Sequence, residues 1–258
     1  MFAVLVIDRD ANFIKRRRLF RTPQVRDVRV YGGLPFRAVT TALRHSDIDR
    51  AAVSQAAGRC AGCMLLPSGI EQGGGIAEPD LSDYSRLLFF NTACDVLREA
   101  LGCGLRGRLC ISDRTASAAG RLSLAVPIVS DIRIVTDCPK AYESAAERAM
   151  EEFGASVVVA DEPAQSDILI DLDSPNGSGE LTLRSGSITA SGINLPSAYM
   201  RLMPQGTDAL KFAAALYEIS RIYSLANLRF EKLFYHGSSI TEEQASQLVR
   251  DVTQLQSY

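Results

Sequence analysis

The stretch RLCISDRTASAAGRLSLAVPIVSDIRIVT, residues 108–136, decides the fold class of this chain. One apolar run ends at Ser112, small side chains follow it, and a second apolar run ends at Thr136. Apolar runs of strand length, separated by a helix-length connection, predict parallel strands joined by a crossover. We therefore expect a strand at 108–112, a helix at 116–125 that ends before Pro127, and a strand at 132–136.

The same alternation continues downstream. Pro139 suits the first turn of a helix, Gly154 suits its end, and apolar runs follow at 156–160 and 167–171. The residues from about Arg106 to Asp173 thus predict a Rossmann-like β-α-β-α-β unit with parallel strands. Beyond this unit, Ser185-Gly186 between two short apolar runs predicts a β-hairpin.

Upstream of this unit the pattern predicts a smaller α/β region. Its expected elements are strands at 2–7, 25–31 and 63–66 and a helix at 36–57, for which an interruption near Ser46 stays open. Residues 67–80 contain four glycines and two prolines, which predicts a flexible linker or a loop over a cleft. The linker is favoured, because no phosphate-loop pattern with Lys and Ser or Thr lies near it.

A long helix is expected to follow the linker at 82–101, apolar nearly all round and therefore buried between layers. The predicted fold class is α/β. A Rossmann-like parallel sheet flanked by helices occupies residues 81–258, and a smaller N-terminal α/β region occupies residues 1–80.

The composition is that of a globular protein, with 258 residues, 47% hydrophobic and 22% charged. No apolar run approaches the roughly 18 residues that a membrane-spanning helix needs. The opening residues reach Asp8 without a basic leader, so they predict a first strand rather than a signal peptide. We therefore expect a cytoplasmic protein with reduced cysteines and no membrane partner.

Charge is distributed unevenly along the chain. Residues 1–59 carry 12 Lys and Arg against 5 Asp and Glu, a net of +7, and the remainder carries 16 against 25, a net of −9. Most of the excess lies in Lys15–Arg18 and at Arg21. Such a patch either steers phosphates or is a solvated helix face that docks on the acidic remainder. No recognised nucleic-acid-binding motif accompanies it, so we do not expect a nucleic acid partner.

Several segments of residues 91–126 carry a family resemblance. They are the helix Asn91-Thr92-Ala93-Cys94-Asp95-Val96-Leu97 with Leu101 closing it, the turn Gly104-Leu105-Arg106-Gly107-Arg108, and the strand Leu109-Cys110-Ile111. They resemble the segment that leads into the dinucleotide-binding domain of the shikimate dehydrogenase family. Ser166–Ile170 is similar to that family's fourth strand, and Phe212–Ile219 to its return helix. The resemblance implies a Rossmann fold, bound NAD(P) and dehydrogenase activity.

The chain departs from that family where the chemistry resides. The family's phosphate loop is Gly-x-Gly-x-x-Gly/Ala, whereas Asp113–Gly120 has no glycine at the turn. A carboxylate at Asp113 repels a phosphate, and Arg114 offsets part of that repulsion. The only lysine of the N-terminal region is Lys15, so the family's catalytic Lys–Asp pair is not recognisable and the catalytic residues are unknown.

Asp113, Thr115, Ser117 and Asp137 are the candidate cofactor-binding residues, because they follow the first two strands of the unit. An acid at 137 holds a ribose diol and repels a 2′-phosphate, which makes NAD the candidate cofactor over NADP. The alternative for Asp137 is a helix cap beside Pro139.

Asn91 and Asp95 are the candidate substrate-cleft residues. They share one helix face at i,i+4 and are expected to bind a polar small molecule in an interdomain cleft. The alternative is that they hydrogen-bond each other on a buried helix.

Other chemistries find less support. Cys60-Ala-Gly-Cys63 is a lone Cys-x-x-Cys without a second pair for zinc, and it is interpreted as core rather than redox-active. His45 and His236 have no Cys or acid at metal spacing, so no metal is expected. A serine-hydrolase elbow of the Gly-x-Ser-x-Gly type does not occur.

Two functions from different classes therefore stay open. The first is a Rossmann-like small-ligand-binding or scaffold module that lacks dehydrogenase chemistry. The second is an NAD-dependent oxidoreductase of shikimate dehydrogenase-like type with an atypical phosphate loop. The last helix, with its narrow apolar stripe of Ala245, Leu248, Val252 and Leu255, predicts either a homodimer or intramolecular docking.

Overall fold

The computed structural model describes residues 1–44, 46–102, 105–160, 168–175 and 179–254. Five residues that entered the sequence analysis lie outside them: His45, Gly104, Ser166, Asp167 and Leu255.

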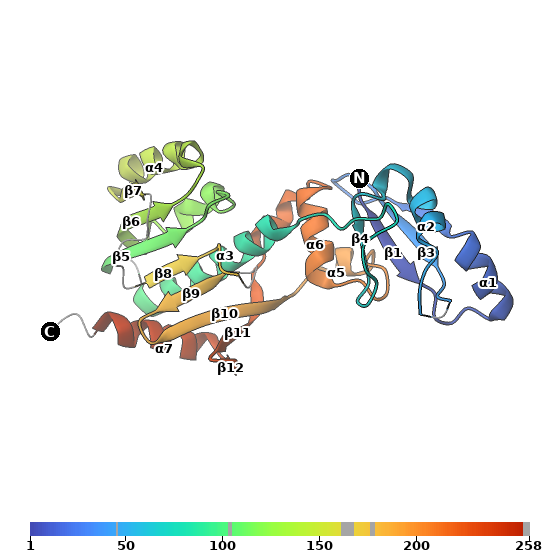
Figure 1. Ribbon diagram of the computed structural model, residues 1–258. Helices are drawn as coiled ribbons and strands as arrows, with labels where there is room; N and C mark the ends of the chain where they lie inside the picture. Colours follow the sequence, from blue (N-terminus) through green and yellow to red (C-terminus); the bar gives the residue numbers. More distant parts are fainter. Residues whose placement is uncertain (45, 103–104, 161–167, 176–178, 255–258) are drawn as a thin grey trace. The chain divides into compact units, whose positions relative to one another are not determined.

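The chain divides into two compact units (Figure 1). Unit 1 comprises Met1–Leu81 and Leu195–Leu225, and unit 2 comprises Ser82–Asn194 and Ala226–Tyr258. The sequence analysis placed 195–225 in the C-terminal region, whereas the structure groups this segment with the N-terminal one. The domain boundaries expected from the sequence therefore differ from the units by one returning segment.

Unit 1 is the smaller α/β unit and contains a four-stranded sheet in the order β2-β3-β1-β4. Its strands are β1 (Ala3–Ile7), β2 (Gln24–Val28), β3 (Phe36–Thr41) and β4 (Met64–Leu65). Its helices are α1 (Phe13–Arg21), α2 (Arg50–Ala57), η1 (Gly58–Cys60), α5 (Ser197–Met200) and α6 (Ala209–Glu218). The chain passes from unit 1 to unit 2 within the short helix η3 (Tyr223–Asn227). Strand β1 pairs in parallel with β3 and β4, and β2 pairs antiparallel with β3.

Both faces of the unit 1 sheet are covered by helices. Successive side chains of a strand point to opposite faces, so different residues of the strands contact each helix. Ala3 and Leu5 of β1 belong to a buried apolar cluster with Val53 of α2. Phe2 stacks on Phe36 and meets the ring of Phe212 edge-on, so α6 packs with this unit. This aromatic contact is the physical reason that 195–225 belongs to unit 1.

The helix expected at 36–57 is wrong in its first half. Residues Phe36–Thr41 form β3, paired in parallel with β1, and of the described residues in this range only Arg50–Ala57 are helical, as α2. The sequence FRAVTT contains β-branched residues and has buried residues on both faces, Phe36 on one and Val39 and Thr41 on the other, which suits a central strand. Asp49 caps α2 by accepting from the Ala52 amide, and this cap sets where the helix begins.

Unit 2 contains an eight-stranded sheet in the order β12-β11-β10-β9-β8-β5-β6-β7. Its strands are β5 (Leu105–Ser112), β6 (Val129–Val135), β7 (Ser156–Ala160), β8 (Ile168–Asp171), β9 (Glu180–Leu183), β10 (Gly186–Ile193), β11 (Phe230–Tyr235) and β12 (Ser238–Ile240). Its helices are α3 (Ser82–Leu101), η2 (Ala119–Leu124), α4 (Pro139–Phe153) and α7 (Glu242–Gln254).

Four neighbouring strands of this sheet are parallel, as the sequence predicted. Strand β5 pairs with β6 on one side and with β8 on the other, and β6 pairs with β7. Across the sheet these strands lie in the order β7-β6-β5-β8, so that by their place in the chain they are the third, second, first and fourth of the four. The same order occurs in four neighbouring strands of a Rossmann sheet. The remaining strands extend the sheet by antiparallel pairing beyond β8. Unit 2 is thus a Rossmann-like parallel sheet flanked by helices, with an antiparallel extension.

Helix α7 packs within unit 2, against α3. Ala245, Val249 and Val252 are buried, and Arg250 donates to the carbonyl groups of Ala100 and Glu99 at the end of α3. The predicted capping box forms, since Thr241 and Gln244 exchange hydrogen bonds between side chain and backbone. The buried stripe contains Val249 in place of the predicted Leu248, which is half-buried, and it is used for packing inside unit 2. A homodimer through α7 stays a prediction.

Within the described residues, no helix combines the length and apolar character needed to cross a bilayer.

Candidate functional site

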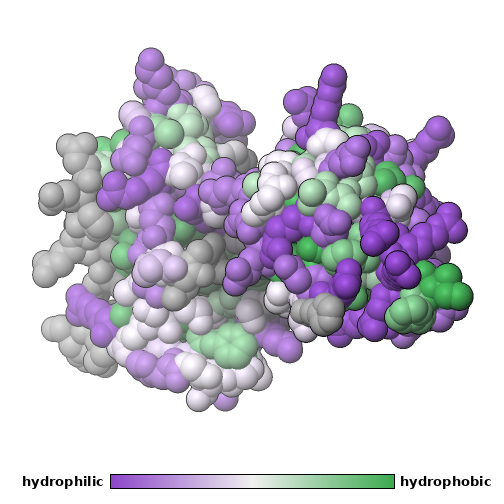
Figure 2. Space-filling view, turned by 45° about the vertical axis from the view of Figure 1, so that its right-hand side comes forward, coloured by the Kyte–Doolittle hydropathy of each residue, from purple (hydrophilic) through white to green (hydrophobic). Residues whose placement is uncertain are grey.

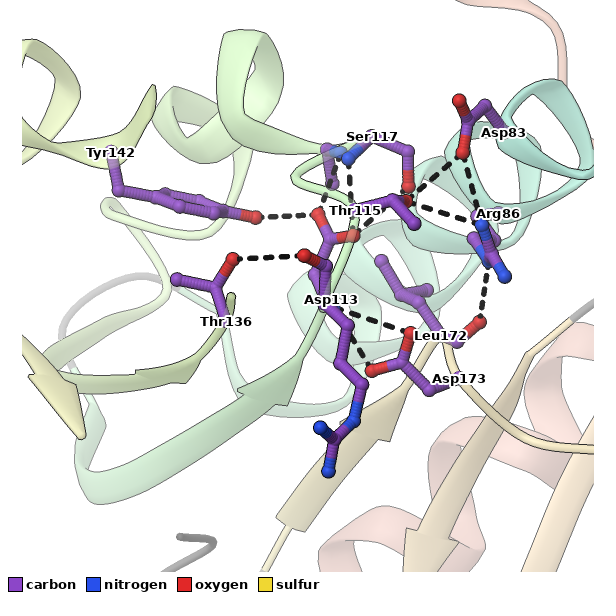
Figure 3. Close-up of polar contacts among 11 residues, drawn as sticks. Asp83, Arg86, Asp113, Thr115, Ser117, Thr136, Tyr142, Leu172 and Asp173 are labelled. Atoms are coloured by element: carbon purple, nitrogen blue, oxygen red, sulfur yellow. Dashed lines mark hydrogen bonds and ion pairs between the residues drawn. The ribbon is translucent and has the colours of Figure 1, made fainter. Parts of the chain in front are cut away.

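The carboxyl ends of β5, β6 and β8 meet beside the start of α3, and polar side chains gather there (Figure 3). Strand order reverses between β5 and β8, because the connection from β5 leads to β6 on one side while β8 lies on the other. In open α/β sheets ligands bind outside the carboxyl ends of the strands at such a switch point. The turn after β5, residues 113–118, is therefore the candidate site.

Asp113 is the centre of this turn and is fully buried, with no exposed surface. Its carboxylate accepts from the Ser117 amide at 3.0 Å, the Ser117 hydroxyl at 3.0 Å and the Ala118 amide at 2.8 Å. A fourth donor, the Tyr142 hydroxyl, lies at 2.6 Å (Figure 3). The carboxylate is thus satisfied inside the protein by groups that point inward from the turn and from α4.

Tyr142 reaches Asp113 because of its position in α4. Pro139 begins this helix and Gly154 ends it in the left-handed conformation, both as the sequence predicted. Tyr142 lies in the first turn and is buried. Burial, and then the nearby Asp113 charge, raise the pKa of the Tyr142 phenol, so this group stays a proton donor at neutral pH.

The connection from β5 to β6 is not the predicted α-helix. It contains the six-residue 3₁₀ helix η2, at Ala119–Leu124, and Ala116 adopts a left-handed backbone with φ 58°. An L-residue in that region costs about 1–2 kcal/mol, which is why a glycine is usual there. The physical reason for the error is that the Asp113 side chain captures the Ser117 and Ala118 amides, which bends the chain before a helix can begin.

Asp173 occupies the opposite side of the switch point. Its carboxylate accepts from the Ser112 hydroxyl at 2.8 Å and from the Arg114 amide at 3.0 Å, so it ties the loop after β8 to the end of β5. The sequence analysis did not identify this residue. Its signal was an Asp-x-Asp pattern, Asp171 and Asp173, directly after an apolar strand.

Arg86 of α3 closes the site from a third side. Its guanidinium donates to the Leu172 carbonyl at 3.1 Å, to Asp83 at 3.0 Å and to the Thr115 hydroxyl at 3.1 Å. Thr115 in turn donates to Asp83 at 2.9 Å. The sequence analysis missed Asp83 and Arg86, whose i,i+3 spacing in the first turns of α3 was the available signal.

Asp137 lies after β6 with an exposed side chain and pairs with Arg114 at 3.5 Å. It does not cap α4, whose N-cap is Cys138 without a side-chain bond. Instead the Thr136 hydroxyl accepts from the Cys138 amide at 3.1 Å. The structure thus brings Asp113, Thr115 and Ser117 into one turn and leaves Asp137 at its solvent-exposed margin.

Asn91 and Asp95 have separate partners in unit 2. The Asn91 amide group is buried and donates to the carbonyl groups of Ala226 and Leu228. Asp95 pairs with Arg98 at 3.0 Å and with Arg229 at 2.6 Å. They make no hydrogen bond to each other within the described residues, so the second interpretation of this pair is not observed. Their part in a substrate cleft stays a prediction.

The described residues contain no group of three or more His, Cys, Asp or Glu side chains able to hold a metal ion. Cys60 is buried in the apolar cluster of unit 1. Burial raises the pKa of the Cys63 thiol, which makes it a poorer nucleophile than an exposed cysteine. These observations favour the core interpretation of the Cys-x-x-Cys.

The residues of the turn do not fit a dinucleotide's pyrophosphate. In a Rossmann site, loop amides and the first turn of a helix donate to the phosphates. Here the Ser117 and Ala118 amides already donate to the Asp113 carboxylate, and η2 is too short to supply a helix terminus. The Asp113 carboxylate thus accepts from the loop amides that would otherwise donate to a phosphate.

No protein-family model matches this chain, and no curated protein matches it in sequence. A solved structure, that of L-tryptophan dehydrogenase from Nostoc punctiforme, matches over 98% of this chain and 78% of that chain with 12% sequence identity and a TM-score of 0.26. Similarity at this level carries no argument about activity. The strand order and parallel pairing described above are what make unit 2 Rossmann-like.

Proposed function

We propose that unit 2 is a Rossmann-like small-ligand-binding or scaffold module in which the turn after β5 is not used for dinucleotide chemistry. The observation that carries the proposal is the buried Asp113 carboxylate, which holds four donors of its own chain. A hydrogen bond to a charged group contributes about 1.5–3 kcal/mol. A phosphate that displaced Asp113 from two of them would lose roughly 3–6 kcal/mol before gaining any contact.

The connections around the turn support a structural role. Asp173, Thr115 and Arg86 link the loops after β5 and β8 to the start of α3. These bonds join the polar groups at the carboxyl end of the sheet, where a cofactor normally binds. The groups pair with one another and form a polar network inside the protein. Such a network, once fully paired, rigidifies the fold around it.

The test is a thermal-shift and calorimetric titration of the full chain with NAD, NADP and ADP. A ligand at 100 times its dissociation constant adds about 2.7 kcal/mol of stability, so a genuine cofactor gives a clear rise in melting temperature. We expect no rise with any of the three at millimolar concentration. A saturable rise with NAD that is lost in Asp113→Asn would overturn the proposal.

The second candidate is an NAD-dependent oxidoreductase of shikimate dehydrogenase-like type with an atypical phosphate loop. The exposed Asp137 carboxylate after β6 favours it, because an acid there suits a ribose diol. Its test is the same titration with Asp137→Asn and with the control Asp131→Asn, a half-buried acid near the other end of β6 that pairs with Arg108 at 3.0 Å. This candidate requires an NAD-induced rise that Asp137→Asn abolishes and Asp131→Asn retains.

A further inference from the structure

Helix α1 of unit 1 has an unusual surface. Only Leu19 of its nine residues is buried, whereas Phe13 and Ile14 at its start are 80% and 79% exposed. The space-filling view shows such apolar surface (green) beside strongly hydrophilic side chains (purple) (Figure 2). Fully burying a Phe side chain stabilises a protein by about 1.5–3 kcal/mol, so its exposure calls for a physical reason.

A groove of about 570 Å³ lies along this helix, within unit 1. It is lined by Phe13, Arg16, Arg17, Phe20, Arg21, Leu43 and Arg44. Its volume lies within the range of about 300–1,000 Å³ that is typical of ligand sites. The groove therefore combines four guanidinium groups with two phenyl rings.

The groove arginines are not neutralised by neighbouring acids. Within the described residues none of the four forms an ion pair with a carboxylate, whereas Arg37 pairs with Asp27 and Arg50 with Asp47, each at 2.8 Å. Two acids precede α1 closely in sequence: Asp8 is held by Lys15 at 2.7 Å, and Asp10 forms no ion pair with a groove arginine within the described residues. Four unpaired guanidinium groups around one concavity call for an anionic occupant.

The order of residues along α1 indicates which anion. Phe13 and Phe20 are seven residues apart, so both lie on one helix face about 10 Å apart along the axis, with Arg16 and Arg17 between them. Phenyl faces stack on nucleobases, and guanidinium groups bind phosphates as planar forks. We propose that this groove binds single-stranded nucleic acid, with bases on Phe13 and Phe20 and the backbone on Arg16, Arg17, Arg21 and Arg44.

The placement of both rings around the groove favours a strand over an anionic lipid surface. Basic residues next to exposed apolar ones also bind bilayers, and they do so by inserting apolar groups. Phe20 is half-buried, and both rings line the groove together with four arginines, although Phe13 is also 80% exposed. The sequence alone carried no recognised nucleic-acid motif, and only the folded helix places the rings and the arginines around one hollow.

The test is fluorescence anisotropy of the full chain with labelled single-stranded oligonucleotides, the deoxythymidine 12-mer dT12 and the uridine 12-mer rU12, at several salt concentrations. Because single strands give a slope of about −0.7 per phosphate contact, four arginines predict a slope of about −3 in log K against log salt. The Arg16→Ala/Arg17→Ala double variant should flatten the slope by about 1.4. Phe13→Ala should weaken binding by about 5-fold or more and leave the slope unchanged.

The matched control is Arg26→Ala/Arg59→Ala, which removes two exposed arginines of unit 1 that do not line the groove. It should change the affinity less than twofold. Because residues 13, 16 and 17 are exposed, these variants should melt within a few degrees of the wild type.

Four outcomes would each overturn the proposal: no binding, an equal loss in the control, unchanged affinity in Phe13→Ala, or retention on phosphatidylserine vesicles that displaces the oligonucleotide. Binding of ADP as tight as dT12 would also contradict it, because a strand is expected to use both rings.

Discussion

The hydroxyl of Tyr142 lies 2.6 Å from the carboxylate of Asp113, and both side chains are buried. This pair joins α4 to the turn after β5, at the position where a Rossmann protein holds a phosphate. The predictions below test whether the pair and its turn form a self-contained structural unit.

Tyr142→Phe should lower the free energy of unfolding by about 1.5–3 kcal/mol, because it removes one hydrogen bond to a buried charged group while keeping the ring. Urea denaturation followed by circular dichroism measures the change. The control is Tyr31→Phe, at a side chain that is 97% exposed, and it should stay within about 0.5 kcal/mol of the wild type. An equal effect of the two substitutions would contradict the importance of the pair.

The same pair predicts a loss of stability at alkaline pH. The pKa of Tyr142 is raised in the folded state by burial and by Asp113, above the unfolded value of about 10. The folded state therefore retains the proton when the unfolded chain releases it. This contribution is complete below pH of about 10 and is lost as pH rises further, by up to about 1.4 kcal/mol per pH unit. Tyr142→Phe should show a shallower decline above pH 10, and parallel curves for the two proteins would refute the assignment.

Asp113→Ala should leave the Ser117 and Ala118 amides and the Tyr142 hydroxyl without an acceptor, at a cost of more than about 2 kcal/mol. If these donors form an anion site that Asp113 fills, added formate should raise the melting temperature of Asp113→Ala more than that of the wild type. Chloride at the same ionic strength is the control. Equal responses to formate and chloride would argue against an anion site.

Ala116 tests the strain in the turn. Ala116→Gly should be neutral or stabilising by up to about 1 kcal/mol, since glycine accepts a φ of 58° at no steric cost but increases the entropy of the unfolded chain. Ala116→Val should destabilise by more than about 1 kcal/mol, because a β-branched side chain is disfavoured there. Thermal melts of the two variants are the measurement, and a valine variant more stable than the glycine variant would contradict the left-handed turn.

Local signals predicted the strands and helices that depend on neighbouring residues alone. Pro139 and Gly154 bound α4, and Thr241 with Gln244 caps α7, because each acts through backbone groups within a few residues. The helix at 36–57 failed because Phe36–Thr41 is a strand through its pairing with β1, some 34 residues earlier in the chain. Pairing of that range depends on tertiary contacts that local periodicity does not contain.

The candidate site was predicted in part. The sequence placed Asp113, Thr115 and Ser117 after a central strand, which is where they lie. It did not identify Tyr142 as the partner of Asp113, Arg86 as that of Thr115, or Asp173 as the acceptor for the neighbouring Ser112 and Arg114. These partners lie 29 to 61 residues away in the chain and meet only at the carboxyl edge of the folded sheet. The acid in the turn therefore suggested only repulsion of a phosphate. In the structure its carboxylate accepts from the amides that a phosphate would otherwise use.

The chain's own sequence determined the parallel strands β5, β6, β7 and β8 and the helices α3 and α4, because apolar periodicity, proline and glycine act locally. The tertiary structure alone decided that Asp113 is buried and fully paired, that residues 195–225 return to the N-terminal unit through Phe212, and that α1 lines a basic groove. The physical reason is the same in each case. Burial and hydrogen bonding join groups that are distant in sequence, and their energies exist only once the elements have packed.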